Sequence, residues 1–253
     1  MFLNKRVIPC LLLANGSLVK TKNFKKFVYI GDPANTVRIF NELEVDELIL
    51  VDIRASLKKT EPNFQIIKEI ASECFMPLSY GGGITSLDQI KKILNIGVEK
   101  VAINSFSTFN PSIISEAAKT FGSQCIIGSI DVRTSYFGKK SIAINDGTKT
   151  LKIDPVDWAI KLENLGAGEL LVTSIDRDGT YEGYDKELID SITKRISIPV
   201  IANGGAGDLN HVDYILNKCN ASAAGLGSMV VYQKKDMGVL VNFPSKGDLK
   251  DII

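Results

Sequence analysis

The sequence comprises 253 residues, of which 45% are hydrophobic and 23% charged, and its formal net charge is +1. This length suits one large core, and the near-neutral charge argues against a nucleic-acid-binding surface or an acidic partner. No apolar run approaches the roughly 20 residues of a membrane span, and the N-terminus lacks the long hydrophobic region of a signal peptide. We therefore expect a cytoplasmic protein with no membrane association.

The residues that most often bind metals or act as nucleophiles are sparse. Cys10, Cys74, Cys125 and Cys219 lie far apart without a Cys-x-x-Cys pair, and His211 is the single histidine. Zinc sites and imidazole-based catalytic triads need such residues together. We expect structural thiols, a surface position for His211, and no metal or cofactor, so that carboxylates, lysines and backbone groups carry any chemistry.

Eight apolar runs of strand type alternate with helical patterns along the chain. The first, residues 6–13, is continuously apolar, which is typical of a parallel strand covered on both faces. A polar and basic stretch, residues 14–31, is then expected to be a long loop, either a lid or a binding loop. The later runs are residues 48–53, 77–80, 100–104, 125–131, 169–174, 199–203 and 223–227.

Helix-start signals lie between these runs. Asp32-Pro33 combines an N-cap residue with proline at the first helical position and predicts a helix to about residue 43. Asn110-Pro111 and Asp154-Pro155 repeat that signal, and Ser86-Leu-Asp-Gln89 has the form of a capping box. Eight alternating strand and helix units in a chain of this length predict an α/β fold, the TIM (β/α)8 barrel. An open doubly wound sheet is the alternative, disfavoured because no G-x-G-x-x-G follows the first strand.

Two of the runs end in glycine clusters, Gly81-Gly-Gly83 and Gly204-Gly-Ala-Gly207. Glycine adopts positive φ and leaves room beside the backbone, and the N–H groups of a following helix start suit a phosphate. Gly204 follows Gly82 by 122 residues, about half the chain. This offset predicts one domain of two similar (β/α)4 halves, roughly residues 1–122 and 123–253, each bringing one phosphate-binding turn to the barrel mouth.

Two acidic stretches follow strands at this predicted mouth. Asp131 ends the fifth run, and a carboxylate at the C-terminal end of a barrel strand favours catalysis, although a loop cap is the plainer alternative. Asp178-Gly179, after the sixth run, could form a turn whose N–H groups face the mouth. The same dipeptide is also common in simple turns.

Five motifs together resemble the cyclase subunit of imidazole glycerol phosphate synthase, the HisF family. They are Gly81-Gly-Gly-Ile84, Phe121-Gly-Ser-Gln124, Gly166-Ala-Gly-Glu169, Thr173-Ser-Ile-Asp-Arg-Asp-Gly-Thr180 and Gly204-Gly-Ala-Gly207. Each alone is weak, but their order along nearly the whole chain is specific, and only about the last twenty residues lack a counterpart. The runs at residues 8–13 and 73–77 are most similar to a paralogous branch found with surface-polysaccharide and sialic-acid-like sugar genes.

The resemblance implies a barrel that forms a heterodimer with a glutaminase (HisH-like) subunit. Ammonia would travel through the barrel to a bis-phosphorylated ribonucleotide at the mouth, which in the histidine pathway yields imidazole glycerol phosphate and an aminoimidazole carboxamide ribotide. One phosphate is assigned to Gly83, Asn104 and Ser105, and the other to Asp178, Gly179, Gly205, Gly227 and Ser228. A charged ammonia gate at the barrel base is matched at all four positions, Arg6, Glu47, Lys100 and Glu169.

One position departs from the family. The family cyclase uses two facing aspartates as general acid and base, at the ends of strands 1 and 5. The second matches Asp131, but the first falls on Leu12, which cannot transfer a proton. Lys20 matches a substrate-facing lysine and is the other catalytic candidate. Loss of a positioned acid or base typically costs about 10²–10⁴-fold, so we expect ligand binding and ammonia conduction to persist while ring closure is weak or lost.

The favoured interpretation is therefore a HisF-type lyase subunit of a glutamine amidotransferase complex, specialised for nitrogen supply in surface-sugar biosynthesis. One alternative is a non-catalytic ammonia channel that activates the glutaminase allosterically. Another is a sister sugar-phosphate isomerase, which also needs two strand-end carboxylates and matches the gate less well.

Overall fold

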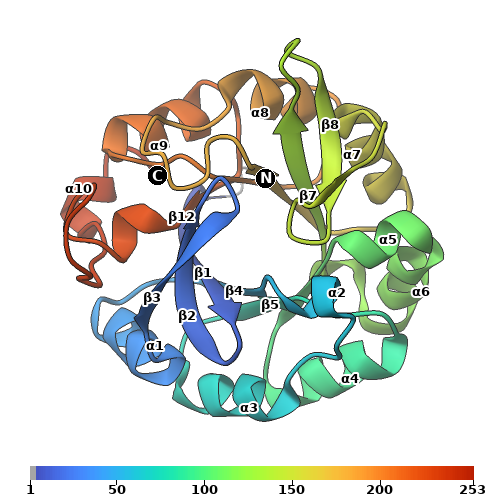
Figure 1. Cartoon of the computed structure of the whole chain (residues 1–253), viewed down its shortest axis with the longest axis horizontal. Coiled ribbons are helices and arrows are strands. Elements are labelled where there is room, and N and C mark those ends of the chain that lie inside the picture. The colour runs from blue at the N-terminus through green and yellow to red at the C-terminus, as the bar shows by residue number, and fades with distance from the viewer. Residues whose placement is uncertain (1–3) are drawn as a thin grey trace.

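The computed structural model describes residues 4–253, which form a closed barrel ringed by helices (Figure 1). Within these residues, the barrel strands are β1 (Arg6–Ala14), β4 (Leu48–Asp52), β5 (Leu78–Gly81), β6 (Lys100–Ile103), β7 (Ile126–Thr134), β10 (Glu169–Ser174), β11 (Val200–Asn203) and β12 (Ala223–Leu226). Neighbouring strands are parallel, and pairing of β10 with β7 closes the ring. The predicted TIM (β/α)8 barrel is confirmed, and the open sheet was the wrong alternative.

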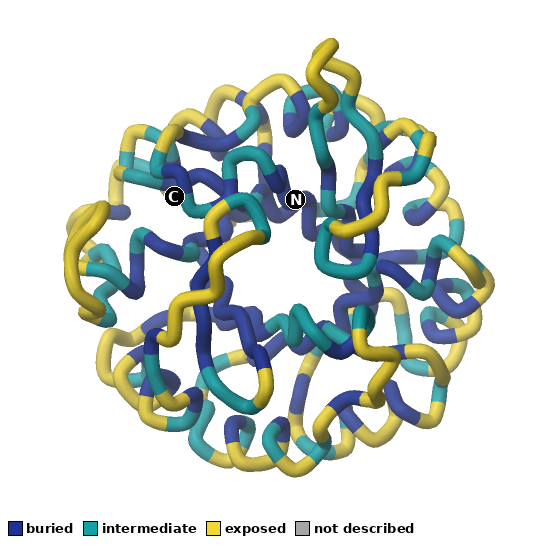
Figure 2. Tube along the Cα trace, in the orientation of Figure 1, coloured by how far each residue is buried: buried dark blue, intermediate teal, exposed yellow. Residues whose placement is uncertain are grey.

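The helices surround the strands, with exposed outer faces and buried inner faces (Figure 2). They are α1 (Pro33–Glu42), α2 (Ala55–Lys58), α3 (Phe64–Glu73), α4 (Leu87–Ile96), α5 (Ser105–Phe109), α6 (Ser112–Phe121), α7 (Pro155–Asn164), α8 (Lys186–Thr193), α9 (Leu209–Asn217) and α10 (Lys246–Leu249), with short 3-10 turns η1 (Ser123–Cys125) and η2 (Ser228–Val230). In residues 4–253 we find no helix with the length and apolarity to cross a bilayer.

The predicted helix starts are mostly confirmed. Asp32 and Asp154 cap α1 and α7 through their side chains. Ser86 accepts a hydrogen bond from the Gln89 amide, but the Gln89 side chain accepts from Thr85 N instead of closing the box on Ser86. The remaining signal, Asn110-Pro111, precedes a helix without a side-chain cap.

The thiols and the histidine differ in how well they were predicted. The four cysteines are free, and Cys10 and Cys219 are buried, as structural thiols are. His211 lies at the surface as predicted, but only 25% of its side chain is exposed. Its Nδ1 accepts a hydrogen bond from Gly207 N at 3.2 Å. This imidazole therefore stabilises the turn after β11 through its hydrogen bond to the backbone.

Alternation along the strands divides the core into two layers. Outward strand side chains such as Tyr80 and buried helix side chains such as Phe40 form the layer between strands and helices. Inward side chains fill the barrel itself, chiefly Ile8, Cys10, Ile49, Ala102, Ile127, Leu171, Ile201 and Ala223. Because successive strand residues point to opposite faces, the inward set of β1 also includes Arg6 below and Leu12 above. The interior is therefore charged at the base, apolar in the middle, and lined by both polar and apolar side chains at the mouth.

Two antiparallel extensions lie at the barrel mouth, and neither was predicted. Residues 14–31 do not form the expected loop, because β2 (Ser17–Lys22) pairs with β1 on one side and with β3 (Lys25–Gly31) on the other. Residues beyond Asp131 continue β7 and pair with β8 (Lys140–Ile144), which in turn pairs with β9 (Lys149–Thr150). Both extensions cross in front of the barrel in Figure 1.

Candidate functional site

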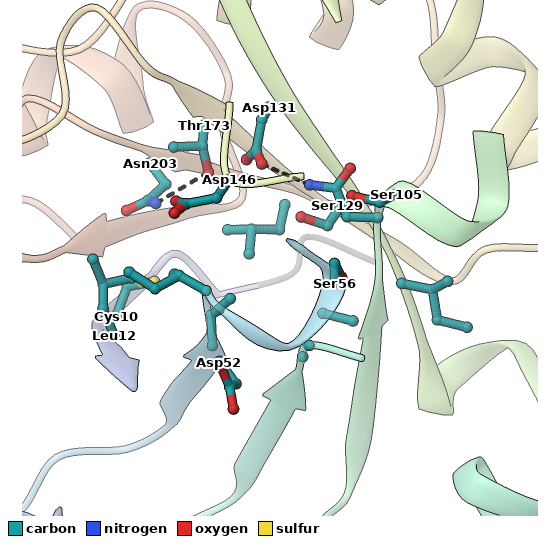
Figure 3. A pocket seen from close by; sticks show the side chains of 18 of the residues that line it. Cys10, Leu12, Asp52, Ser56, Ser105, Ser129, Asp131, Asp146, Thr173 and Asn203 are labelled. Atoms are coloured by element: carbon teal, nitrogen blue, oxygen red, sulfur yellow. Dashed lines mark hydrogen bonds between the residues drawn. The ribbon is translucent and has the colours of Figure 1, made fainter. Parts of the chain in front are cut away.

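A pocket occupies the mouth, between the strand ends and the two hairpins (Figure 3). Together with the open solvent at its entrance, it encloses about 880 Å³ not filled by protein atoms. The sequence-predicted residues that line it are Leu12, Lys20, Gly83, Asn104, Ser105, Asp131 and Asp178. The predicted residues Gly179, Gly205, Gly227 and Ser228 are not in its wall.

Asp131 extends into this pocket from β7, on the same inward side as Ile127. Its Oδ2 accepts a hydrogen bond from Asn104 Nδ2 at 2.7 Å. Burial raises the pKa of Asp131 to about 7, against the lowering effect of this bond and one from Thr173, while the charges of Asp146 and Asp178 raise it further. A carboxyl group that can hold or release a proton near neutral pH is suited to general acid–base catalysis.

Leu12 faces the same pocket from the end of β1. Its side chain is buried in a small apolar cluster with Ala14 and Val19, and Val51 and Ile53 pack beside them. This side of the mouth therefore offers a surface for apolar contact and no ionisable group at the β1 position.

The first glycine turn follows β5. Gly82 and Gly83 have φ of 120° and 71°, and both are packed against backbone. A Cβ at Gly83 would lie 2.7 Å from the Thr60 carbonyl oxygen, and one at Gly82 would collide with the carbonyl oxygen of Asp52. The turn brings Gly83 into the pocket wall that also holds Asn104 and Ser105. Three residues predicted to share one phosphate are thus neighbours.

Alanine substitutions distinguish two reasons why this turn needs glycine, its positive φ and the lack of space for a Cβ. Gly97 has a φ of 112°, but nothing lies within 4 Å of the place that an added Cβ would take, whereas Gly82 has backbone there. We expect Gly97→Ala to lower the free energy of unfolding by about 1–2 kcal/mol, the cost of left-handed backbone. Gly82→Ala should lower it by about 1–3 kcal/mol more, the cost of overpacking. Urea unfolding measures both, and equal losses would contradict the packing argument.

Residues predicted to bind the second phosphate lie under the β2–β3 hairpin. Thr21 Oγ1 donates to Asp178 Oδ2 at 2.7 Å, and Asn23 N donates to the Asp178 carbonyl at 2.9 Å. A Cβ at Gly227 would collide with Lys20 Nζ, and one at Gly179 with the Thr21 carbonyl. These contacts bring Lys20, Asp178, Gly179 and Gly227 together. Gly205 lies beside this group, because a Cβ added to it would be 3.0 Å from Cβ of Arg177, the neighbour of Asp178.

Lys20 is buried, with 3% of its surface exposed, yet it extends to the pocket. Among residues 4–253, no carboxylate lies within ion-pairing distance of its ammonium. Burial of an uncompensated charge is costly, and a bound anion would relieve that cost. The ammonium of Lys20 lies against Gly227, immediately before η2.

The four predicted gate residues meet at the opposite end of the barrel. Arg6 Nη1 lies 2.7 Å from Glu47 Oε2, and Arg6 Nη2 bonds to Glu169 Oε1. Lys100 Nζ lies 3.1 Å from Glu47 and 2.9 Å from Glu169. Burial lowers the pKa of Lys100, but the two glutamates outweigh this and leave that pKa raised. Two cations and two anions thus form a closed, neutral ring across the barrel base.

Comparison with known proteins decides the family. The family model described as "Histidine biosynthesis protein" matches residues 6–236, which include every barrel strand. The chain belongs to this family. Within it, the motif-based resemblance to HisF is confirmed.

The relatives of this HisF-family chain match it over nearly their full length. A Pseudomonas aeruginosa protein named "Putative imidazole glycerol phosphate synthase subunit hisF2" is 46% identical over 245 residues, 97% of this chain and 98% of its own. The imidazole glycerol phosphate synthase subunit HisF of Hydrogenobaculum sp. is 42% identical over 232 residues, 92% of each chain. That of Methanococcus vannielii is 38% identical over 255 residues, 93% of this chain and 94% of its own.

Several pocket residues were missed by sequence reasoning. Asp52 accepts from the amides of Arg54 and Ala55 at 2.9 and 3.1 Å and so caps α2. Thr173 and Asn203 are hydrogen-bonded to each other at 3.1 Å in the inner wall. Asp146 reaches the pocket from the β8–β9 turn. Asp52 carried the same strand-end signal as Asp131, and Asp146 carried the Asp-Gly pair typical of a hairpin turn.

Proposed function

We propose that this HisF-family protein is the cyclase-type subunit of an imidazole glycerol phosphate synthase-like complex. Its mouth binds a bis-phosphorylated ribonucleotide, and ammonia from a glutaminase partner reaches that ligand through the barrel. The observation that carries the proposal is Asp131, a carboxyl with a pKa raised to about 7, which shares one pocket with the first glycine turn and Lys20. The match to HisF subunits over more than nine-tenths of the chain supports it.

The proposed chemistry needs proton transfer at two places. When ammonia adds to a carbonyl carbon, its lone pair forms the C–N bond and the C=O electron pair moves to oxygen. The nitrogen then gives a proton to a base, and the oxygen takes one from an acid. Asp131 can serve as one of these groups, with Asn104 holding its carboxyl in place.

The two phosphates of the ligand would occupy opposite walls of the mouth. Gly83, Asn104 and Ser105 would bind one of them through the first glycine turn. The second would bind at Asp178–Gly179, Gly205 and Gly227–Ser228, with Lys20 supplying the positive charge. The buried ammonium of Lys20, which has no carboxylate partner among residues 4–253, supports this assignment. A bound phosphate would compensate its charge, so this lysine would bind an anion in addition to facing the substrate.

Lys20→Met tests the second phosphate position. We expect the affinity for inorganic phosphate to fall about 10–100-fold, since a hydrogen bond to a charged group contributes about 1.5–3 kcal/mol. Titration calorimetry measures the change. Lys22→Met is the matched control, because Lys22 lies on the same strand but is exposed, and it should bind phosphate as the unaltered protein does. Equal affinities for the two variants would rule out this role of Lys20.

The gate ring and Leu12 bear on the partner and the pathway. We propose that the ring of Arg6, Glu47, Lys100 and Glu169 controls ammonia entry from a HisH-like glutaminase in a heterodimer. Leu12 and the resemblance to the paralogous branch support a specialised role in nitrogen supply for surface-sugar biosynthesis, with slower ring closure than in HisF proteins that carry an aspartate there.

One assay tests the proposed function. The purified protein is mixed with the bis-phosphorylated ribonucleotide and ammonium, and then with the glutaminase partner and glutamine, and ring closure is followed by absorbance. Slow turnover from both nitrogen sources is expected. Glutaminase activation without ring closure would instead favour the non-catalytic channel, and isomerisation of the preceding aminoaldose would favour the sister isomerase. Turnover as fast as that of an ordinary HisF subunit would contradict the slowing attributed to Leu12.

A further inference from the structure

The mouth contains a second carboxylate that could transfer protons, and it comes from a hairpin rather than from a barrel strand. Asp146 lies in the β8–β9 turn, where it and Gly147 have φ of 59° and 68°. Thr148 N donates to the Asn145 carbonyl at 3.2 Å, so Asp146 and Gly147 are the two central residues of a type I′ turn. Such turns normally sit at the surface with their side chains in water.

Asp146 does not behave as an ordinary turn residue. Its side chain is only 4% exposed and lines the same pocket as Asp131 (Figure 3). Asparagine or glycine would form the turn equally well, and burial of a carboxylate costs free energy unless its charge is compensated. The turn alone therefore does not explain an aspartate here.

Surrounding contacts hold Asp146 in place. Arg54 Nη1 lies 3.2 Å from its Oδ2, and the Arg54 guanidinium also stacks on Phe27 of β3, 4.9 Å from the ring centre. The neighbouring Asn145 amide donates to Ser105 Oγ at 3.0 Å, and Arg133 donates to the Gly147 carbonyl at 3.2 Å. The turn is thus fixed from three sides, with its carboxylate directed into the mouth.

The other carboxylates of the pocket wall are already engaged. Asp52 caps α2, and Asp178 accepts the Thr21 hydroxyl. Asp146 has its Arg54 contact but no such structural task, and its side chain lines the same pocket as that of Asp131 (Figure 3). Asp131 and Asp146 are therefore the pair available for proton transfer.

We propose that Asp146 is the second proton-transferring carboxylate of the mouth and does the work for which Leu12 has no ionisable group. This inference rests on the proposed function. As ammonia adds to the carbonyl carbon, Asp146 accepts a proton from nitrogen and protonated Asp131 gives its proton to oxygen. The pair holds one proton before and after this step, and the roles reverse when the hydroxyl leaves as water.

The charged groups around the pair agree with these roles. Burial raises the pKa of Asp146 to about 6, and Arg54 opposes that rise. With the pKa of Asp131 at about 7, the pair carries about one proton near neutral pH. The charges that face Asp146 are Arg54 from the β4–α2 connection, Asp131 and Arg133 from β7. Turnover should thus fall at low pH as the base becomes protonated.

The test measures kcat and KM with ammonia as nitrogen source between pH 5 and 9. We expect Asp146→Asn to lower kcat by about 10²–10⁴-fold with KM changed little, and to remove the fall at low pH. Arg54→Met should retain turnover but shift that fall to higher pH, because the cation that lowers the pKa of Asp146 is gone. Asp236→Asn is the matched control, since Asp236 is an exposed aspartate with a φ of 63°.

The outcomes separate this role from the proposed function. Unchanged kcat and an unchanged low-pH fall in Asp146→Asn would overturn the role of Asp146 while leaving the proposed function intact. A rise in KM without a change in kcat in Asp146→Asn would make Asp146 a binding residue and would also overturn its role in proton transfer. If the decline in turnover at low pH is not shifted in Arg54→Met, the assignment of Asp146 as the base is wrong. Absence of turnover from the unaltered protein at every pH would overturn both proposals.

Discussion

The Asp131→Asn variant is expected to lose ammonia-dependent turnover by about 10²–10⁴-fold, the usual contribution of a positioned acid or base. Asparagine has nearly the same shape, and its amide oxygen can still accept the hydrogen bond that Asn104 donates. Ligand affinity should therefore change little while kcat falls. Steady-state assays with ammonium bypass the glutaminase and therefore measure the fall in kcat at the barrel mouth alone.

The pH dependence of the unaltered protein provides a second test of Asp131. Its pKa is raised to about 7 by burial, so a role as acid requires the protonated form, and turnover should fall as pH rises through about 7. The same shift affects stability with a definite sign. A raised pKa means that the folded state holds the proton more tightly, so stability falls as pH rises from the unfolded value of about 4 to about 7.

Asp131→Asn removes this buried charge, so at pH 8 it should unfold at higher urea concentration than the unaltered protein although its activity is lost. Asp251→Asn, at an exposed position outside the helices, should change neither quantity. A variant that loses activity and stability together would indicate a structural role for Asp131 instead.

The second large effect concerns the ion-pair ring at the barrel base. Lys100→Met removes two ion pairs and leaves Glu47 and Glu169 to share Arg6. We expect glutamine-dependent turnover to fall about tenfold or more, as for loss of one charge-assisted contact. Ammonia-dependent turnover should fall much less, because added ammonium reaches the mouth directly from solvent.

The ratio of the two turnover rates is the informative measurement for the ring. Lys152→Met, at an exposed position before α7, is the control and should leave that ratio unchanged. Unequal charge at the base should also destabilise the barrel, because removal of one partner leaves a buried carboxylate incompletely paired. An equal loss from glutamine and ammonia would contradict control of ammonia entry by the ring.

The barrel was predictable because its signals are local and repeated. Apolar runs of strand length, aspartate–proline helix starts and the 122-residue offset each depend on residues close in sequence or on a simple period. The structure repeats that offset in its strands, since β5 begins at Leu78 and β11 at Val200. The two hairpins were missed for the opposite reason. The polar and basic character of residues 14–31 suggested a long loop, although Leu18 and Val19 within this stretch are buried.

Local pattern predicted the candidate site only where a strand end or a glycine cluster marked it, and the family resemblance added Lys20. Asp131 and Gly83 had such markers, and the pocket wall contains both. The pairing of Asp146 with Arg54 had none, because the two residues are 92 positions apart and only the return of the β8–β9 turn over the mouth brings them together. A contact of that kind depends on the whole closed barrel and cannot be inferred from local pattern.

Because inward and outward side chains alternate along β1, the directions in which its two end residues point depend on each other. Arg6 at the base and Leu12 at the mouth both point inward because an even number of positions separates them. Insertion or deletion of one residue between them would turn one of the two outward and break either the ring or the pocket wall. The two ends of this strand can therefore change independently by substitution, but not by insertion or deletion of a single residue between them.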